Sequence, residues 1–203
     1  MFTGIIEDIG RVIGSEDRAG QRTLSLEAGV VADELHVGSS VAVSGVCLTA
    51  TECKGKRFSV DVSTETLERT TLGQLLRDGR VNLELPVRPQ GRLDGHFVLG
   101  HVDGRGRVLS VRQHGSDRVL RIEHDREADG LIVEKGSIAV DGVSLTVTAC
   151  GNAWFELMLI PHTIRATTLG ELAEGDAVNL EYDILGKYLI RLSEIGRIPW
   201  QRS

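Results

Sequence analysis

The sequence predicts an all-β fold of two similar barrels in tandem, followed by one C-terminal α-helix. The first observation is an internal repeat: SVAVSGVCLT at Ser40 returns as SIAVDGVSLT at Ser137, an offset of 137 − 40 = 97 residues. Because this repeat is far longer than the about 20–50 residues of a solenoid unit, it indicates two whole domains. We expect the first domain at residues 1–96 and the second at residues 97–203.

The second observation is that apolar residues occur in short runs that alternate with polar ones. Phe58–Val62 and Val81–Leu85 both show this period of two, which is typical of β-strands separated by turn residues. Each copy holds about six such candidate strands. Because closure removes unpaired strand edges, short strands in this number favour a small barrel over an open sheet.

The third observation is a single strong helical pattern, which we place at about residues 184–196 with Asp183 as its N-cap. Its apolar stripe consists of Leu185, Tyr188, Leu189, Leu192 and Ile195. The stripe either packs on its own barrel or meets its equivalents in other subunits, and the narrow spacing favours association. Shorter helices are expected at Thr64–Arg69, capped by Thr64, and at Pro161–Ala166, where proline suits the first turn.

Composition narrows the class of protein. The net charge of −6 argues against a nucleic-acid partner, which would require a basic face. No apolar run is long enough to span a membrane, and the N-terminus lacks the pattern of a signal peptide, so we expect a cytoplasmic protein. The three cysteines are odd in number and form no C-x-x-C pair, which argues against a disulfide framework and against a zinc site.

A few residues differ between the copies and are therefore candidates for chemistry. Cys47 has Ser144 as its equivalent, and this difference is either drift or a mark of a site. Cys53 and Cys150 are equivalents of each other, and we interpret both as core positions. His96 and His101 occur only at the start of the second copy. They would lie on opposite faces of a strand, so a shared metal site is not expected, and both remain either strand-end residues or site residues.

Four motifs in order resemble the riboflavin synthase alpha-chain family, over essentially the whole chain. They are MFTGII at Met1, SGVCLT at Ser44, the two Gly-His pairs ending at His96 and His101, and KGSIAVDGVSLT at Lys135. The resemblance implies six-stranded Greek-key barrels, and a C-terminal helix that builds a homotrimer. It also implies a transferase that needs no cofactor. Two molecules of 6,7-dimethyl-8-ribityllumazine exchange a four-carbon unit and give riboflavin and 5-amino-6-ribitylamino-2,4(1H,3H)-pyrimidinedione, the last step of riboflavin biosynthesis.

The resemblance leaves an association with lumazine synthase open. It also leaves an alternative function, a non-catalytic lumazine- or flavin-binding antenna protein on the same fold. Such a protein would retain one pocket and lose the residues of the other. Residues of both pockets are present here, which favours the enzyme: Ser40, Cys47, His96, His101, Ser144 and Asp183.

Carried over motif by motif, the resemblance implies a substrate pocket in each copy. In the first copy the pocket residues are Gly4, Ile5, Ile6, Cys47, Leu48, Thr49, Asp61, Val62, Ser63, Thr64, Glu65 and Thr66. In the second copy they are Gly100, His101, Val102, Lys135, Ser144, Leu145, Thr146, Ile160, Pro161, His162, Thr163, Ile164 and Arg165. In this family the productive site lies between the first barrel of one subunit and the second barrel of its neighbour.

The implied reaction needs a base that takes a proton from the 7-methyl group of one lumazine, and a nucleophile or water that activates the other. His101 and His96 are our candidates for proton transfer, because an ordinary histidine pKa near 6.5 suits a shuttle at neutral pH. Ser40 and Cys47 are candidates for the nucleophile, or for positioning an activating water. Holding two substrates face to face can contribute roughly 7–11 kcal/mol.

Overall fold

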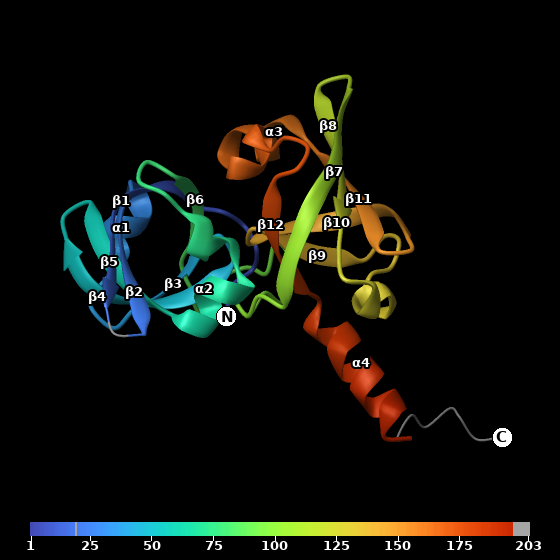
Figure 1. Cartoon of the computed structure of the whole chain (residues 1–203), viewed down its shortest axis with the longest axis horizontal. Helices are drawn as coiled ribbons and strands as arrows, with labels where there is room; N and C mark the ends of the chain where they lie inside the picture. Colours follow the sequence, from blue (N-terminus) through green and yellow to red (C-terminus); the bar gives the residue numbers. More distant parts are fainter. Residues whose placement is uncertain (19, 197–203) are drawn as a thin grey trace.

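Each copy of the repeat folds into a closed antiparallel barrel of six strands in the computed structural model, which describes residues 1–18 and 20–196. The two barrels lie side by side (Figure 1). The strands of the first barrel are β1 (Asp8–Arg18), β2 (Gln21–Glu27), β3 (Ser40–Val43), β4 (Val46–Lys54), β5 (Arg57–Ser63) and β6 (Arg80–Glu84). Its short helices are α1 (Val30–Glu34), α2 (Thr64–Arg69) and the 3-10 helix η1 (Thr71–Gln74).

The second barrel repeats this plan. Its strands are β7 (Gly104–His114), β8 (Asp117–Glu123), β9 (Ser137–Val140), β10 (Val143–Gly151), β11 (Trp154–Leu159) and β12 (Ala177–Tyr182). Its helices are η2 (Arg126–Leu131), α3 (Pro161–Ala166) and η3 (Thr168–Glu171), and α4 (Ile184–Glu194) follows. In both barrels the second strand pairs with the fifth rather than the third, which is the order of a Greek key. The predicted fold class is confirmed.

Both barrels are filled by the apolar positions of their alternating strands. One buried cluster is centred on residues such as Leu24, Phe58 and Leu83, and the other on their counterparts in the second barrel. A small third cluster of Phe2, Ala42, Val98 and Ala139 lies outside both cores, with Cys47 packed against it. Cys53 and Cys150 pack against the edges of the first and second cores and are only partly buried.

The barrels are joined by buried contacts that are nearly symmetric. Asn82 Nδ2 donates to the Asp141 carbonyl (2.9 Å), and Asn82 Oδ1 accepts from the backbone N–H that begins η3 (2.8 Å). Asn179 makes the same two contacts in reverse, with the Ser44 carbonyl (2.8 Å) and with the N–H that begins η1 (2.7 Å). Both asparagines are 1% exposed, so these bonds are buried and fix how the barrels face each other.

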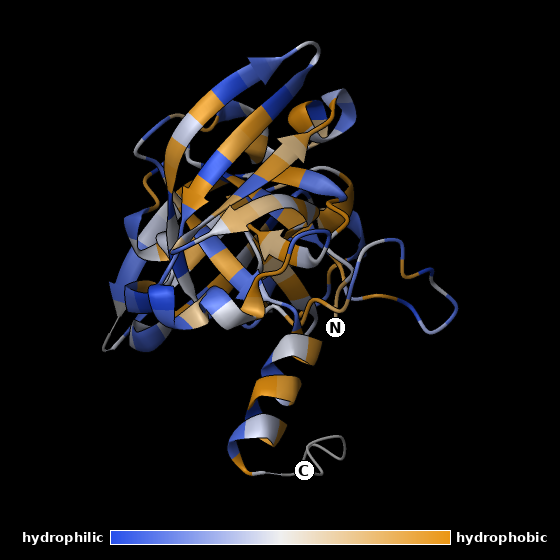
Figure 2. Ribbon diagram, turned by 90° about the vertical axis from the view of Figure 1, so that its right-hand side faces the viewer, coloured by the Kyte–Doolittle hydropathy of each residue, from blue (hydrophilic) through white to orange (hydrophobic). Residues whose placement is uncertain are grey.

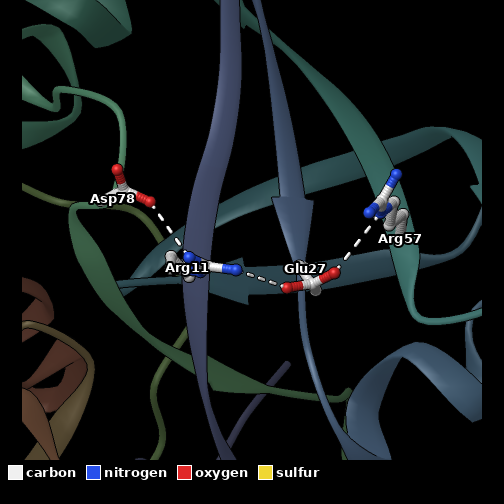
Figure 3. Close-up of polar contacts among 4 residues, drawn as sticks. All are labelled: Arg11, Glu27, Arg57 and Asp78. Atoms are coloured by element: carbon white, nitrogen blue, oxygen red, sulfur yellow. Dashed lines mark hydrogen bonds and ion pairs between the residues drawn. The ribbon is translucent and has the colours of Figure 1, made fainter.

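On the outer surface of the first barrel, charged side chains connect neighbouring strands (Figure 3). Arg11 on β1 contacts Glu27 on β2 (2.8 Å) and Asp78 in the turn before β6 (3.1 Å). Glu27 also contacts Arg57 on β5 (3.4 Å). Hydrogen bonding from Arg11 lowers the pKa of Glu27. Because these groups are exposed, we assign the network a modest part in stability.

The predicted helix starts are mostly confirmed at the residue level. Asp183 caps α4, and its carboxylate accepts from Leu185 N (3.0 Å). Pro161 occupies the first turn of α3 as predicted. The predicted cap of α2 is wrong by one residue: Ser63 accepts from Thr66 N (3.2 Å), and Thr64 Oγ1 instead donates to the Gly20 carbonyl (2.7 Å). Two adjacent hydroxyl residues both suit a cap, and the contact with the β1–β2 turn selects the first.

Helix α4 extends away from the second barrel (Figures 1 and 2). Lys187 Nζ holds it to Asp103 (2.6 Å), and Ile190 lies near Gly130 of η2. The predicted apolar stripe is 40–65% exposed along its length, so it does not pack on its own barrel. Among the described residues, no helix is both long and apolar enough to cross a membrane.

Candidate functional site

The segment before each barrel crosses to the other barrel. The Gly4 carbonyl accepts from Ser144 N on β10 (2.8 Å), and the Gly100 carbonyl accepts from Cys47 N on β4 (2.8 Å). Ile6 packs against the second core, and Val102 packs against the first. A short antiparallel contact between Phe2 and Val98 holds the two segments together.

This crossing changes how the predicted pocket residues are grouped. The family resemblance implies that Gly4–Ile6 belong to the first pocket and Gly100–Val102 to the second. The structure places Gly4–Ile6 beside β10 and Gly100–Val102 beside β4. The physical reason is that β1 begins only at Asp8 and β7 only at Gly104. The preceding residues are therefore outside their own barrels and free to pair elsewhere.

Glycine is required at both crossing points. Gly4 and Gly100 have φ values of 79° and 77°, a region that side chains with a Cβ rarely adopt. A Cβ at Gly100 would lie 2.5 Å from Cys47 Cβ, and one at Gly4 would lie 2.6 Å from Ser144 Cβ. Each loop backbone therefore lies directly against the residue that differs between the copies.

Two buried glutamates hold the crossing loops. Glu181 at the end of β12 accepts from Leu99 N (2.7 Å), Gly100 N (2.9 Å) and His101 N (3.1 Å). Glu84 at the end of β6 accepts from Thr3 N (2.7 Å) and Gly4 N (3.0 Å). Burial raises the pKa of both carboxyl groups, while the backbone N–H groups act in the opposite direction. Sequence reasoning had not assigned these residues to the site.

His96 lies at the second barrel's site. Its Nδ1 is 2.7 Å from Ser144 Oγ, and its backbone N donates to the Thr3 carbonyl (3.1 Å). The residue is 8% exposed, and its buried Nε2 has no hydrogen-bond partner among the described residues. Burial lowers the pKa of His96, although the nearby charge of Asp183 opposes this. At neutral pH the ring is therefore uncharged and able to accept a proton.

His101 lies at the other site. Its backbone N is held by Glu181, its side chain is exposed, and it follows Gly100, which contacts Cys47. The structure thus separates the two candidate histidines: His96 contacts Ser144, whereas His101 lies next to the loop that covers Cys47. Cys47 as a whole residue is partly buried.

Ser40 faces a cavity near the first barrel's β3. The cavity has a volume of about 330 Å³ and is also lined by Glu34, Leu35, Leu85 and Arg88. In the β3–β4 register Ser40 is opposite Thr49, and Ala42 is opposite Cys47. Ser40 therefore lies two residues along β3 from Ala42, the residue opposite Cys47.

The remaining predicted pocket residues divide by exposure. Leu48, Val62 and Leu145 point into the barrel cores, so they can offer a ligand only their backbone. Asp61 accepts from Thr23 Oγ1 (2.6 Å), and Ser63 is the cap of α2. Exposed side chains are found at Ile5, Thr49, Thr64, Glu65, Lys135, Thr146, Ile160, His162 and Arg165, while Ile6, Thr66, Pro161, Thr163 and Ile164 are partly buried.

The helices that follow the fifth strand of each barrel, α2 and α3, carry chemically different side chains at equivalent positions. Glu65 on α2 has His162 as its equivalent on α3. Among residues 1–18 and 20–196, no group of three or more His, Cys, Asp and Glu side chains is placed to hold a metal ion.

The comparisons with known proteins agree with this duplicated arrangement. Residues 3–86 and 99–183 each match the lumazine binding domain family. The chain is 44% identical to a riboflavin synthase of Mycobacterium bovis over 196 residues, covering 95% of this chain and 98% of that protein. It is 41% identical to a riboflavin synthase of Actinobacillus pleuropneumoniae over 189 residues, covering 93% and 88%.

Solved structures confirm the fold. The crystal structure of LumP complexed with riboflavin superimposes with a TM-score of 0.83 at 22% sequence identity, covering 90% of this chain and 99% of that one. The structure of LumP complexed with 6,7-dimethyl-8-(1'-D-ribityl)lumazine gives a TM-score of 0.82 at 20% identity, with the same coverage.

Proposed function

The chain belongs to the riboflavin synthase family, with two lumazine-binding domains in one polypeptide, and we propose on that premise that it converts two lumazines into riboflavin. In this reaction two molecules of 6,7-dimethyl-8-ribityllumazine exchange a four-carbon unit, and 5-amino-6-ribitylamino-2,4(1H,3H)-pyrimidinedione is the second product. One substrate gains the carbons that the other loses, so the atoms balance without an added oxidant or reductant.

The observation that carries the proposal is the pair of equivalent sites at Cys47 and Ser144, each completed by a loop from the other repeat. Two identical substrates need two similar sites, and the different side chains at these sites allow the substrates to follow different paths. The antenna alternative is not favoured, because relatives at 36–44% identity are riboflavin synthases, whereas LumP is 20–22% identical.

For the chemistry, we assign His96 and His101 to proton transfer. His96 is uncharged at neutral pH because burial lowers its pKa, and its contact with Ser144 Oγ forms the hydroxyl–base pair that activates a hydroxyl or a water. His101 is exposed beside the Cys47 site, where it can reach a bound ligand. Cys47 and Ser40 would position the activating water or act as the nucleophile.

We also propose a homotrimer built through α4. The apolar stripe of that helix lies in solvent in the single chain, with Tyr188 65% exposed and Leu185 58% exposed, and association would bury it. The productive site would then form between the first barrel of one subunit and the second barrel of its neighbour. A cytoplasmic location is consistent with the free thiols of Cys47, Cys53 and Cys150. Association with lumazine synthase remains open to test by co-sedimentation.

The direct test is incubation of the purified protein with 6,7-dimethyl-8-ribityllumazine alone. We expect one riboflavin for every two lumazines consumed, measured by absorbance and by chromatography of the pyrimidinedione. Tight binding without turnover would instead establish an antenna protein.

A further inference from the structure

The repeated stretch Val-Asn-Leu-Glu, at Val81–Glu84 on β6 and Val178–Glu181 on β12, is not used by the chemistry proposed above. In a barrel strand that alternates between core and solvent, the polar positions would face water. Here all four residues of each stretch are buried, and both glutamates are only 3% exposed. A buried carboxylate is costly unless it is fully hydrogen-bonded, so each glutamate must have a specific partner.

The partners are backbone N–H groups that converge from one loop. Glu181 receives three of them, from Leu99, Gly100 and His101, at 2.7–3.1 Å. Glu84 receives Thr3 N and Gly4 N together with Thr3 Oγ1 (2.9 Å). Only a group that accepts at both oxygens can satisfy such a set, and among side chains an ionised carboxylate does this best.

Each loop, held by its glutamate, in turn hydrogen-bonds to the opposite barrel. Glu181 belongs to the second barrel, but the Gly100 carbonyl that it orients bonds to Cys47 N of the first. Glu84 belongs to the first barrel, but the Gly4 carbonyl bonds to Ser144 N of the second. The structure therefore contains two separate relays, by which we mean a glutamate, the loop backbone that it holds and the backbone N–H that this loop contacts in the opposite barrel. One relay leads to Cys47 and the other to Ser144.

We propose that Glu181 and Glu84 are positioning residues that each build the ligand site of the opposite barrel. Glu181 serves the site at Cys47 and His101, and Glu84 serves the site at Ser144. The proposal rests on the proposed function for the identity of the ligand, but the two relays themselves are properties of the fold.

A merely structural role gives a different expectation. If the glutamates only held the barrels together, the loss of either one would loosen the shared interface and disturb both sites alike. If each is a relay, each loss disturbs one site and spares the other. The repeat supplies the matched control, since Glu84→Gln and Glu181→Gln are the same change at equivalent places. Glutamine keeps the shape but turns a donor toward a backbone N–H, which leaves that pair unsatisfied.

The readout is the reactivity of one thiol at each site. With Cys53→Ala and Cys150→Ala as background, Cys47 is the remaining cysteine. A second background adds Cys47→Ser and Ser144→Cys, which moves the thiol to the equivalent position in the other barrel. Iodoacetamide alkylation is followed by mass spectrometry, without ligand and with riboflavin, which the proposed reaction makes and does not consume.

We expect Glu181→Gln to change the alkylation rate of the Cys47 thiol by about 10-fold, and the riboflavin concentration for half-protection by a similar factor. Glu84→Gln should leave both within about twofold in that background. The pattern should reverse for the thiol introduced by Ser144→Cys. Equal effects of both variants on both thiols, or no effect on either, would overturn the proposal.

Two further outcomes keep the test decisive. If a glutamine variant does not fold, as judged by its melting curve, Gly100→Ala and Gly4→Ala replace the pair, because their Cβ atoms would push the same loops off Cys47 and Ser144. The same site-by-site pattern is required of them. If riboflavin protects the single thiol in neither of the two backgrounds with both glutamates intact, the ligand sites and the proposed function fail. If riboflavin protects the thiol in these backgrounds but the glutamate variants affect both sites alike, only the relay proposal fails.

Discussion

Replacing Asp141 by serine is expected to stabilise the protein, and this gain in unfolding free energy over the unchanged chain should be larger at high pH than at low pH. Asp141 lies in the β9–β10 turn at the junction of the barrels and is 7% exposed. Its Oδ1 accepts from Asn179 N (2.8 Å). The equivalent residue in the first barrel is Ser44, whose Oγ accepts from Asn82 N (3.3 Å), so serine can fill the same role.

Burial raises the pKa of Asp141 from 3.8 to about 7. The folded protein therefore retains this proton at pH values where the unfolded chain has lost it. The cost of burying the charge is absent below about pH 4, grows as the pH rises and is complete above about pH 7. At ~1.4 kcal/mol for each pH unit between the two pKa values, the full cost is about 4 kcal/mol, of which about 2–3 kcal/mol develops between pH 5 and pH 8.

The measurement is urea unfolding at pH 5 and pH 8 for the unchanged protein, Asp141→Ser and Asp141→Asn. Asparagine keeps the shape and the accepting oxygen but cannot ionise, so it separates the charge from the packing. Asp141 lines a cavity of about 490 Å³ between the barrels. The other charged residues around this cavity are present in all three proteins, so their contribution to the pH dependence cancels in the comparison: Asp78, Arg80, Glu171 and Asp176. Parallel pH profiles for the three proteins would refute the reasoning.

Three further predictions concern the sites and the assembly. Turnover should fall more in His101→Ala or Cys47→Ala than in the control Cys53→Ala, because Cys53 only packs against the first core. Equal losses in folded proteins would contradict the site assignment. His96→Ala should lower kcat more than it raises KM. Because burial lowers the pKa of His96 and the neutral ring is the active form, the acid limb of the pH–rate profile should lie below pH 6.5, and a limb above that value would exclude this role. Leu189→Glu on α4 should release single chains in sedimentation that remain folded by circular dichroism, since this side chain is 51% exposed in the single chain. An unchanged assembly would place the interface elsewhere.

The barrels and α4 could be predicted because their signals are local. A period of two in Val81–Leu85 specifies a strand, and Asp183 before an apolar stripe specifies a helix start. The 97-residue offset then requires that both copies adopt one topology, since equivalent sequences have equivalent preferences. The structure agrees with the predicted fold for this reason.

The crossing of the loops could not be predicted, because the repeat shows which residues are equivalent but not which barrel they contact. Gly4 could have paired with Cys47 as well as with Ser144 so far as the apolar pattern shows. The choice is made in three dimensions, by where β1 and β7 begin and by the positive φ angles of Gly4 and Gly100. The role of Glu84 could not be predicted for a related reason, since a polar residue in an alternating strand normally indicates a side chain that faces solvent.

The near-symmetry of the junction explains where chemical difference between the sites must come from. The crossing carbonyls make the same contact at both sites, since each accepts from a backbone N–H of the opposite barrel at 2.8 Å. These two backbone contacts therefore cannot assign different roles to two identical substrates. The differences are in side chains: the first site has the Cys47 thiol where the second site has the Ser144 hydroxyl, and the His96 ring contacts that hydroxyl. One substrate donates carbons and the other accepts them, so the two sites must differ chemically. In this protein the duplicated backbone gives two similar sites for identical substrates, and these few side chains make the two sites chemically different.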